Sequence, residues 1–258
     1  MRLLLDIGNT RLKWAVQAAQ GLREQQAVVH AGLSAAQLQA QVFAPSGAVS
    51  RVLVSNVAGP AMAEQVRQAA RECWGIEPEF KMATASSSLE QGLLHNAYVE
   101  PAKLGADRWA ALLGAYAMQS SAALVVSIGT ALTIDALAID VLTAQGRHLG
   151  GMIAPGPDLM MSSLMRHTSD IAERARPSHL GGEAGDAFFA DNTLGCVYQG
   201  SVHAAVGLIE AAYAQLCAVT GEARLLLTGG AAAAVQGRLS MPVQAVPDLV
   251  LKGLATYA

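Results

Sequence analysis

A repeated sequence pattern constrains the fold of this chain more than any other feature. The segment "RLLLDIGNTRLKWAVQAA", residues 2–19, contains an apolar strand, a polar residue, Ile-Gly, small hydroxyl-bearing turn residues and a second strand. The segment "ALVVSIGTALTIDALAID", residues 123–140, repeats this order, so that Asp6 matches Ser127 and Asn9 matches Thr130. Two such units far apart in the chain predict a duplicated domain, with two glycine turns facing one another across a cleft.

The segments between and after these units alternate between strand and helix patterns. "RVLVSNV" and "PEFKMA" are typical of strands, whereas "SAAQLQAQVF" and "AMAEQVRQAARECW" are typical of helices. A predicted helix over 106–118 carries Trp109, Leu112, Leu113 and Tyr116 on one face. A long helix over about 193–219, a strand "ARLLLTGG", a short helix around 231–238 and a closing helix "PDLVLKGLATY" complete the second domain. This alternation indicates an α/β fold with mixed sheets flanked by helices.

Length and composition bound the class of protein. The 258 residues are enough for about two domains, which we expect over 1–104 and 105–258. The chain is 52% hydrophobic with a mean hydropathy of +0.33, which raises the question of a membrane span. Residues 109–134 carry no charge, but Gly129 and Thr130 interrupt them and the pattern changes from helix to strand. The sequence therefore predicts no membrane association.

Three further features restrict location and partners. "MRLLLDIG" has too short an apolar run for a signal peptide, so the cytoplasm is the expected location. The three widely spaced cysteines fit neither a disulfide framework nor a zinc site. A net charge of −3 without any run of basic residues argues against a nucleic-acid partner.

The first turn carries the residues most suggestive of chemistry. Asp6 ends an apolar strand, where a carboxylate is costly unless it is paired, hydrogen-bonded or bound to a cation. In the turn 8–10, glycine and asparagine are expected to supply the positive φ of a tight hairpin. Its N–H groups, with Asn9, Thr10 and Lys13, could hold phosphate while Asp6 holds Mg²⁺. Alternatively, Asp6 satisfies the turn backbone and Lys13 is solvated.

Standard nucleotide fingerprints are absent, but a longer set of motifs is present. No G-x-x-x-x-G-K-[ST] or G-x-G-x-x-G occurs at a strand end. "DIGNTRLK", "LGADRW", "SIGTALTID", "GGMIAPG" and "DNT" occur in the order and rough spacing seen in type III pantothenate kinases, with "PDLVLKGLA" near the end. The chain therefore resembles that family over nearly its whole length. The resemblance implies duplicated actin-like (ribonuclease H-like) domains with a nucleotide cleft between them.

The resemblance also implies a function and a set of site residues. It implies ATP-dependent phosphorylation of pantothenate to 4'-phosphopantothenate, the first step of coenzyme A biosynthesis, with Mg²⁺ near Asp6 and Asp107 as the general base. The second phosphate loop would contain Gly129 and Thr130. The first would contain Asp6, Ile7, Gly8, Asn9, Thr10, Arg11, Leu12 and Lys13. Pantothenate would contact Tyr98, Gly105, Ala106, Asp107, Arg108 and Thr193, in a pocket that the family builds at a homodimer interface.

Each implied role has a structural alternative. Asp107 lies in the first turn of its predicted helix, where an acid is stabilised by the helix dipole without any catalytic role. Arg108 could bind the substrate carboxylate or neutralise surface charge on its own helix. Tyr98 could be a core aromatic with its hydroxyl at the surface, and Thr193 could help to cap the long helix. The six histidines form no motif, and a structural role is the preferred interpretation of each, His148 included.

One position departs from the family pattern. The family usually has aspartate where this chain has Ser127, and that aspartate is linked to a monovalent cation, potassium or ammonium. A neutral hydroxyl binds a cation more weakly, so the cation site is in doubt. Asp135 is a candidate substitute, with an acid at the surface end of a strand as the alternative.

The sequence leaves two rival functions. One is another phosphotransferase of the superfamily acting on a different small acceptor, which only Tyr98 and "LGADR" would distinguish. The other is a non-catalytic regulatory protein on the same fold, against which the presence of both Asp6 and Asp107 argues. On the small residues Gly195, Gly200, Ser201, Ala204 and Gly207, the long helix could approach a second copy or pack within its own chain.

Overall fold

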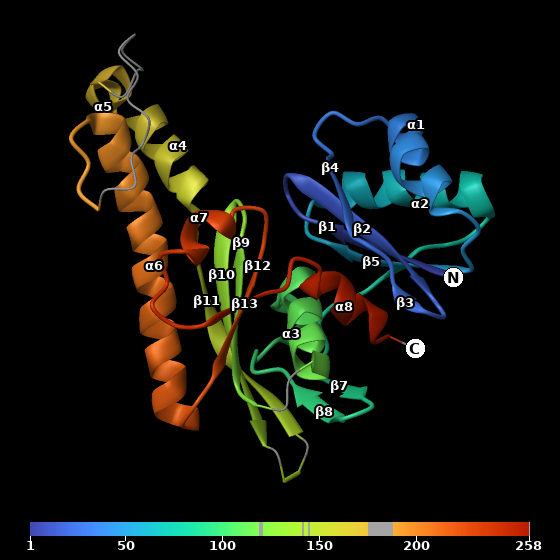
Figure 1. The fold of residues 1–258 in the computed structure, drawn as a ribbon. Helices are drawn as coiled ribbons and strands as arrows, with labels where there is room; N and C mark the ends of the chain where they lie inside the picture. Colours follow the sequence, from blue (N-terminus) through green and yellow to red (C-terminus); the bar gives the residue numbers. More distant parts are fainter. Residues whose placement is uncertain (119–120, 141, 144, 175–187, 258) are drawn as a thin grey trace. The chain divides into compact units, whose positions relative to one another are not determined.

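The computed structural model describes residues 1–118, 121–140, 142–143, 145–174 and 188–257 (Figure 1). It contains two compact units. The first consists of Met1–Ala122, Leu137–Gly150 and Asp248–Ala258, and the second of Ala123–Ala136 and Gly151–Pro247. Strands β10 (Ala131–Asp140) and β11 (Gln145–Pro155) each run from one unit into the other. These units are defined by contacts, so the division of the duplicated sequence at 104 and 105 stays a prediction.

The first unit contains a sheet in the order β3-β2-β1-β5-β6, with β4 also paired to β2. The central strand β1 (Arg2–Ile7) is antiparallel to β2 (Arg11–Ala18) and parallel to β5 (Arg51–Asn56). Because β1 and β5 are parallel, both end at the same edge of the sheet. The remaining strands are short: β3 (Gly21–Leu22), β4 (Gln26–Val29) and β6 (Glu79–Phe80). A hairpin of β7 (Ser86–Leu89) and β8 (Gly92–His95) adds to the start of β11.

The two faces of this sheet are covered by different helices. Leu3, Leu5 and Ile7 of β1 form a core with α1 (Ala35–Leu38), the π-helical turn Gln39–Phe43 and α2 (Pro60–Trp74). Because side chains alternate along a strand, Leu4 and Asp6 lie on the other face. Helices α3 (Ala106–Met118) and α8 (Leu249–Ala255) cover that face (Figure 1). The alternation of β1 therefore places Asp6 beneath α3.

Two glycines bring α3 and α8 together. A β-carbon at Gly253 would collide with the carbonyl oxygen of Ala110, and one at Gly114 would lie 2.5 Å from the carbonyl oxygen of Leu249. This backbone-to-backbone approach joins the closing helix to the first unit, whereas the sequence pattern alone grouped it with the second half.

The second unit contains the strand order β13-β12-β9-β10-β11. Strand β12 (Arg224–Thr228) is parallel to β9 (Ala123–Ile128) and to β13 (Val243–Ala245). Its core joins β9, β10 and β12 to the long helix α6 through residues such as Val126, Leu227, Val202 and Ile209. The helices of this unit are α4 (Pro157–His167), α5 (Ser169–Arg174), α6 (Thr193–Thr220) and α7 (Ala233–Gln236). Single 3-10 turns occupy Ala44–Ser46 and Pro101–Lys103 in the first unit.

Most predicted elements are confirmed, with differences in detail. The helix over 106–118 is confirmed, and its Trp109, Leu112, Leu113 and Tyr116 are buried. The helix expected over 34–43 is confirmed, as α1 followed by the π-helical turn Gln39–Phe43. The strand expected over 78–83 consists of Glu79 and Phe80 alone. Residues 109–134 contain α3 followed by β9 and the start of β10, as the interrupted pattern predicted.

Helix α6 is, by length and composition alone, apolar enough to cross a membrane. A core helix meets the same criteria, and one side of α6 packs on the second unit's sheet. In its most apolar 18-residue window, 28% of the residues are buried. The remaining apolar surface of this helix therefore requires an explanation.

Candidate active site

The first glycine turn closes the hairpin of β1 and β2. Ile7 pairs with Leu12, and the N–H of Gly8 donates to the carbonyl oxygen of Arg11 at 3.0 Å, which leaves Asn9 and Thr10 as the loop. The expected positive φ at Gly8 is wrong, because this ladder hydrogen bond keeps Gly8 out of the left-handed region. The side chains of Ile7 and Leu12 are in the core, so only their backbone atoms could contact a ligand.

Histidine 30 supports this turn from the neighbouring strand. Its Nε2 lies 2.7 Å from the carbonyl oxygen of Gly8, and its backbone N–H donates to the carbonyl oxygen of Thr10 at 3.3 Å. Because a carbonyl oxygen only accepts, Nε2 carries the proton in this contact. The sequence had favoured a structural histidine here, and a structural contact is what His30 makes.

Asp6 lies in a polar row that crosses three strands of the sheet. It is the register partner of Lys13 on β2 and of Ser55 on β5. Register partners share one face of a sheet, so the three side chains point to the same side, beneath α3. Asp6 is 9% exposed and Ser55 is fully buried, whereas Lys13 is half-buried. The role of Lys13 in phosphate binding stays a prediction.

The electrostatics of Asp6 link it to Asp107. Burial raises the pKa of the Asp6 carboxyl to about 7, from an ordinary value of 3.8. The positive charge of Lys13 opposes this rise, and the negative charge of Asp107 adds to it. Asp107 lies in the first turn of α3, as the sequence predicted. The fold therefore brings together two carboxylates and a lysine from separate segments, in a place where the buried carboxylate is costly to ionise.

The segment around Asp107 forms a second cluster with Tyr98. Arg108 is 6% exposed, and its Nη1 donates to the Tyr98 hydroxyl at 2.9 Å. The ring of His148 stacks on Tyr98 with centroids 6.0 Å apart. A surface charge role for Arg108 is therefore wrong, because its guanidinium is buried. The Tyr98 hydroxyl accepts this hydrogen bond, and the Tyr98 side chain is half-buried.

Gly105 and Ala106 lead into this cluster. A β-carbon at Gly105 would lie 2.7 Å from Asp107 Oδ1, which itself accepts a hydrogen bond from the backbone N–H of Arg108 at 2.8 Å. A side chain at 105 would therefore crowd the Asp107 carboxylate, whereas the φ of Gly105 is not in the left-handed region. Ala106 is the first residue of α3.

The second glycine turn belongs to the second unit. The N–H of Gly129 donates to the carbonyl oxygen of Ala131 at 2.9 Å, and the N–H of Gly156 donates to that of Thr130 at 2.9 Å. A β-carbon at Gly156 would collide with the carbonyl oxygen of Gly129. Gly229, at φ +101°, lies against Ile128 in the same way. Three separate segments therefore meet at this turn through backbone contacts that side chains would prevent.

Ser127 and Asp135 lie close to this turn in the sequence, on β9 and β10. Ser127 is half-buried and pairs with Thr228 of β12. Asp135 is 2% exposed within β10, so a surface acid at a strand end is wrong for it. The role of Asp135 as a ligand of a cation therefore stays a prediction, on a side chain that is buried within the strand.

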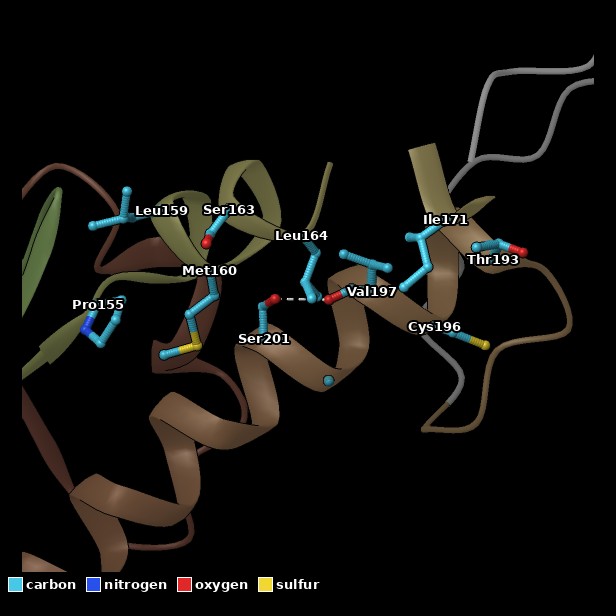
Figure 2. A pocket seen from close by; sticks show the side chains of 11 residues that line it. Pro155, Leu159, Met160, Ser163, Leu164, Ile171, Thr193, Cys196, Val197 and Ser201 are labelled. Atoms are coloured by element: carbon cyan, nitrogen blue, oxygen red, sulfur yellow. Dashed lines mark hydrogen bonds between the residues drawn. The ribbon is translucent and has the colours of Figure 1, made fainter. Parts of the chain in front are cut away.

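Thr193 begins α6 and lines a cavity. The helix cap is Asn192, whose Oδ1 accepts from the Gly195 N–H at 2.8 Å, so a capping role for Thr193 is wrong. Figure 2 shows the cavity, which has a volume of about 790 Å³. It lies among α4, α5 and α6, with Leu159, Met160 and Ile171 among its apolar walls.

The side chains that could donate to a metal ion at these residues are carboxylates. Among the described residues, no group of three or more histidine, cysteine, aspartate or glutamate side chains could hold a metal by itself. Magnesium, however, is usually held by one or two carboxylates together with substrate phosphates. Asp6 supplies one such carboxylate at the end of β1.

The sequence alone did not identify Ser55, His30, His148 or Gly156 as parts of these clusters. Each lies far along the chain from the residue it contacts or neighbours, and of the four only Gly156 lies in a quoted motif, "GGMIAPG". The strand pattern of "RVLVSNV" was the only available signal for Ser55, because a polar residue interrupts an apolar strand there.

Comparison with known proteins gives a consistent result. The family model described as type III pantothenate kinase matches residues 2–215. A protein of Aromatoleum aromaticum named type III pantothenate kinase is 38% identical, covering 100% of this chain and 98% of that protein. A protein of Herminiimonas arsenicoxydans with the same name is 37% identical, covering 100% of this chain and 97% of the relative.

Solved structures share the fold at lower identity. A candidate 2-dehydro-3-deoxygalactonokinase from Sinorhizobium meliloti has a TM-score of 0.57 at 14% identity, over 99% of this chain and 97% of that one. A candidate Baf-family transcriptional activator from Campylobacter jejuni has a TM-score of 0.51 at 19% identity, over 98% of this chain and 95% of that one. These similarities concern the fold alone. The predicted α/β class, with mixed sheets flanked by helices as in actin-like kinases, is confirmed.

Proposed function

Because the chain belongs to the type III pantothenate kinase family, it transfers a phosphoryl group from ATP to pantothenate, and we propose that Asp6, Lys13 and Asp107 form the reacting centre. The observation that carries this proposal is the electrostatic interaction between Asp6 and Asp107 beside the cross-strand partner Lys13. A strand end that gathers these charges is suited to a metal-bound polyphosphate and poorly suited to an apolar ligand. The reaction belongs to coenzyme A biosynthesis.

Asp107 is the proton acceptor in this proposal. The hydroxyl of pantothenate attacks the γ-phosphorus of ATP, the bond to the β,γ-bridging oxygen breaks, and ADP leaves. The hydroxyl proton passes to the Asp107 carboxylate, and the product is 4'-phosphopantothenate. The transition state of phosphoryl transfer is loose, so Asp107 mainly orients the hydroxyl and accepts its proton late. Asp107 Oδ1 accepts a hydrogen bond from the backbone N–H of Arg108, and this bond holds the carboxylate in one orientation for the proton transfer.

Asp6 is the residue that we assign to Mg²⁺, directly or through water. The ion, when bound, neutralises charge on the phosphate oxygens. Asp6 presents a hard oxygen donor, and its neighbour Lys13 adds a positive charge for the same phosphates. Since burial disfavours the ionised form of Asp6, an arriving cation also relieves a cost that the ligand-free protein carries.

The two glycine turns hold the ATP phosphates. In the first phosphate loop, Asp6 to Lys13, the contacts come from the exposed Asn9 and Thr10 side chains and from backbone N–H groups that the β1–β2 ladder does not use. In the second turn they come from Gly129 and Thr130, which the Gly156 contact holds in place. Catalysis then depends chiefly on positioning and electrostatics.

Pantothenate is recognised by the cluster that surrounds Asp107. Arg108 binds the pantothenate carboxylate, and Tyr98, held by Arg108 and by the stacked His148, forms one wall with Gly105 and Ala106. A guanidinium suits a carboxylate because its N–H groups match the two oxygens. Thr193 contributes to the pantothenate pocket through a homodimer of this chain.

We infer a homodimer from α6. Gly200, Ala204 and Gly207 are exposed on one side of this helix, and β-carbons at both glycines would have open space around them. Glycine within a helix costs about 1 kcal/mol relative to alanine, and packing inside this chain does not require it at either position. Close approach of a second copy of the chain does require glycine at these two positions. By contrast, Gly195 and Ser201 pack within the chain, since Gly195 contacts Ala190 and Ser201 is buried.

Two finer properties complete the proposal. A monovalent cation is bound with the help of the buried Asp135 in place of the family aspartate that Ser127 replaces. The enzyme acts in the cytoplasm, where ATP and pantothenate meet. The regulatory alternative is not favoured, because the relatives described above are named as kinases and the similarity to the Campylobacter protein concerns the fold alone.

A coupled ATPase assay with pantothenate tests this function. We expect ADP release that depends on pantothenate and on Mg²⁺, with a single phosphorylated product by mass spectrometry. Replacing sodium by potassium or ammonium should raise the rate if Asp135 binds the cation, and Asp135→Asn should remove that response. Pantothenate-independent turnover, or turnover only with sugars, would contradict the assignment.

A further inference from the structure

Ser55 has a buried hydroxyl that the fold does not use. Its side chain is 0% exposed, and among the described residues its Oγ has no hydrogen-bond partner. Buried polar groups are nearly always hydrogen-bonded, because an unpaired one costs stability. The surroundings are apolar, with Leu4 and Leu53 fully buried on the same face. Alanine would suit this position better if folding were the only requirement.

The register of the sheet places this hydroxyl beside one particular carboxylate. Ser55 and Asp6 are partners in the parallel ladder of β5 and β1, and Lys13 is the partner of Asp6 on its other side. The side chains of register partners are adjacent on one face. The ladder continues beyond them, because the N–H of Val57 donates to the carbonyl oxygen of Ile7 at 2.9 Å. Ser55 is therefore held at a constant position relative to Asp6.

The loop that follows Ser55 is also well anchored. Asn56 Oδ1 accepts from the N–H of Ala58 at 3.0 Å, and its Nδ2 donates to the carbonyl oxygen of Gly59 at 2.9 Å. These hydrogen bonds fix the chain where β5 turns into α2. On this anchored backbone, rotation about the Cα–Cβ bond of Ser55 changes only the direction in which its hydroxyl points.

We propose that Ser55 is a positioning residue, whose hydroxyl donates a hydrogen bond to the Asp6 carboxylate when Asp6 binds magnesium. This rests on the proposed role of Asp6. Ser55 is fully buried, so it touches neither substrate nor metal and acts only through Asp6. A hydroxyl bound to a carboxylate forms a charge-assisted hydrogen bond, which is roughly twice as strong as a neutral one. The Ser55 hydroxyl, which is unpaired in the ligand-free protein, thus gains its hydrogen-bond acceptor when magnesium binds to Asp6.

Nucleotide binding measured with and without the metal tests this role. We would compare Ser55→Ala with the wild-type protein by calorimetric titration of a non-hydrolysable ATP analogue, once in excess Mg²⁺ and once in EDTA. The proposal expects the affinity for the magnesium complex to fall about tenfold, in line with loss of a hydrogen bond to a charged group. The affinity in EDTA should not change. The ligand-free variant should melt at the same temperature as the wild type or higher.

Ser46 provides a matched control. It is a buried serine of the same unit, but its Oγ donates to the carbonyl oxygen of Val42 at 2.6 Å. Ser46→Ala should lower the melting temperature and leave the Mg²⁺ enhancement of nucleotide affinity unchanged. An unchanged Mg²⁺ enhancement in Ser55→Ala, or a loss of stability like that of Ser46→Ala, would overturn the proposal.

Asp6→Asn separates this proposal from the function on which it depends. If Asp6→Asn loses the Mg²⁺ enhancement and Ser55→Ala keeps it, Ser55 has no positioning role and Asp6 keeps its own. If Asp6→Asn keeps the enhancement, the assignment of Asp6 to magnesium fails, and the role of Ser55 fails with it.

Discussion

Gly105 leaves the space that the Asp107 carboxylate occupies, since a β-carbon at position 105 would lie 2.7 Å from Asp107 Oδ1. A carboxylate at the end of a side chain can rotate away from such a clash at small cost. We therefore expect Gly105→Ala to fold with a nearly unchanged melting temperature while its kcat falls at least tenfold, because Asp107 is displaced. Steady-state kinetics and thermal melts check this. A normal kcat in the folded variant would show that the orientation of Asp107 is unimportant.

Asp107→Asn tests the proton acceptor itself. The amide keeps the shape of the side chain and an oxygen to accept the Arg108 N–H, so folding should be preserved. It removes the basic group, and general-base groups typically contribute 10²–10⁴-fold to rate. We expect kcat to fall by about that factor while pantothenate still binds, as measured by calorimetry. Wild-type turnover would remove Asp107 from the mechanism.

The raised pKa of Asp6 predicts an unusual dependence of the free energy of unfolding on pH. In the ligand-free protein its pKa is raised to about 7, so between about pH 4 and pH 7 the folded state holds a proton that the unfolded state has lost. Stability due to this group therefore falls as pH rises through that range. A shift of about three pKa units corresponds to at most about 4 kcal/mol.

The matched comparison for Asp6 is Asp6→Asn, which carries no charge at any pH. We expect this variant to be more stable than the wild type at pH 8 and about equally stable at pH 4, by urea unfolding of the ligand-free proteins. Its catalytic activity should nevertheless be lost. A stability difference that does not change with pH would mean that Asp6 is ionised at little cost in the folded protein.

The packing of α3 on α8 gives a prediction about folding alone. Gly253→Ala would drive a methyl group into the backbone carbonyl of Ala110, which cannot move without shifting α3. We expect a loss of about 3 kcal/mol in the free energy of unfolding, at the upper end for overpacking. Gly237→Ala is the control, because a β-carbon there meets nothing within 4 Å and its φ is −75°. Equal stability of the two variants would contradict this packing.

The proposed dimer predicts the effect of a charge on α6. Gly207 is exposed with open space around it, so Gly207→Glu should leave the fold of each chain intact. It should shift the protein from dimer to monomer in light scattering and weaken pantothenate binding through Thr193. Gly237→Glu, at an equally open glycine that caps the C-terminal end of α7, should remain dimeric. A Gly207→Glu protein that stays dimeric would place the interface elsewhere.

Local patterns were sufficient for much of the fold and for selecting the residues that we propose to react. The buried stripe of α3, the long α6 and the two Ile-Gly turns follow from periodicity and turn chemistry, which act over a few residues. Asp6 stood out because an acid interrupts an apolar strand, and "LGADRW" brought attention to Asp107 and Arg108. The structural alternatives for Arg108 and Thr193 could not be settled in this way, because burial depends on what packs against a residue.

The sequence by itself determined the α/β class, the family and the residues that carry charge near the first turn. Only the tertiary structure decided that Asp6 stands between Lys13 and Ser55 beneath α3, that α8 joins the first unit, and that Gly156 closes on the second turn. The physical reason is the range of the interactions. Periodicity and turn preferences are local, whereas strand register, the raised pKa of Asp6 and backbone-to-backbone approach at glycine depend on segments that meet only when the chain has folded.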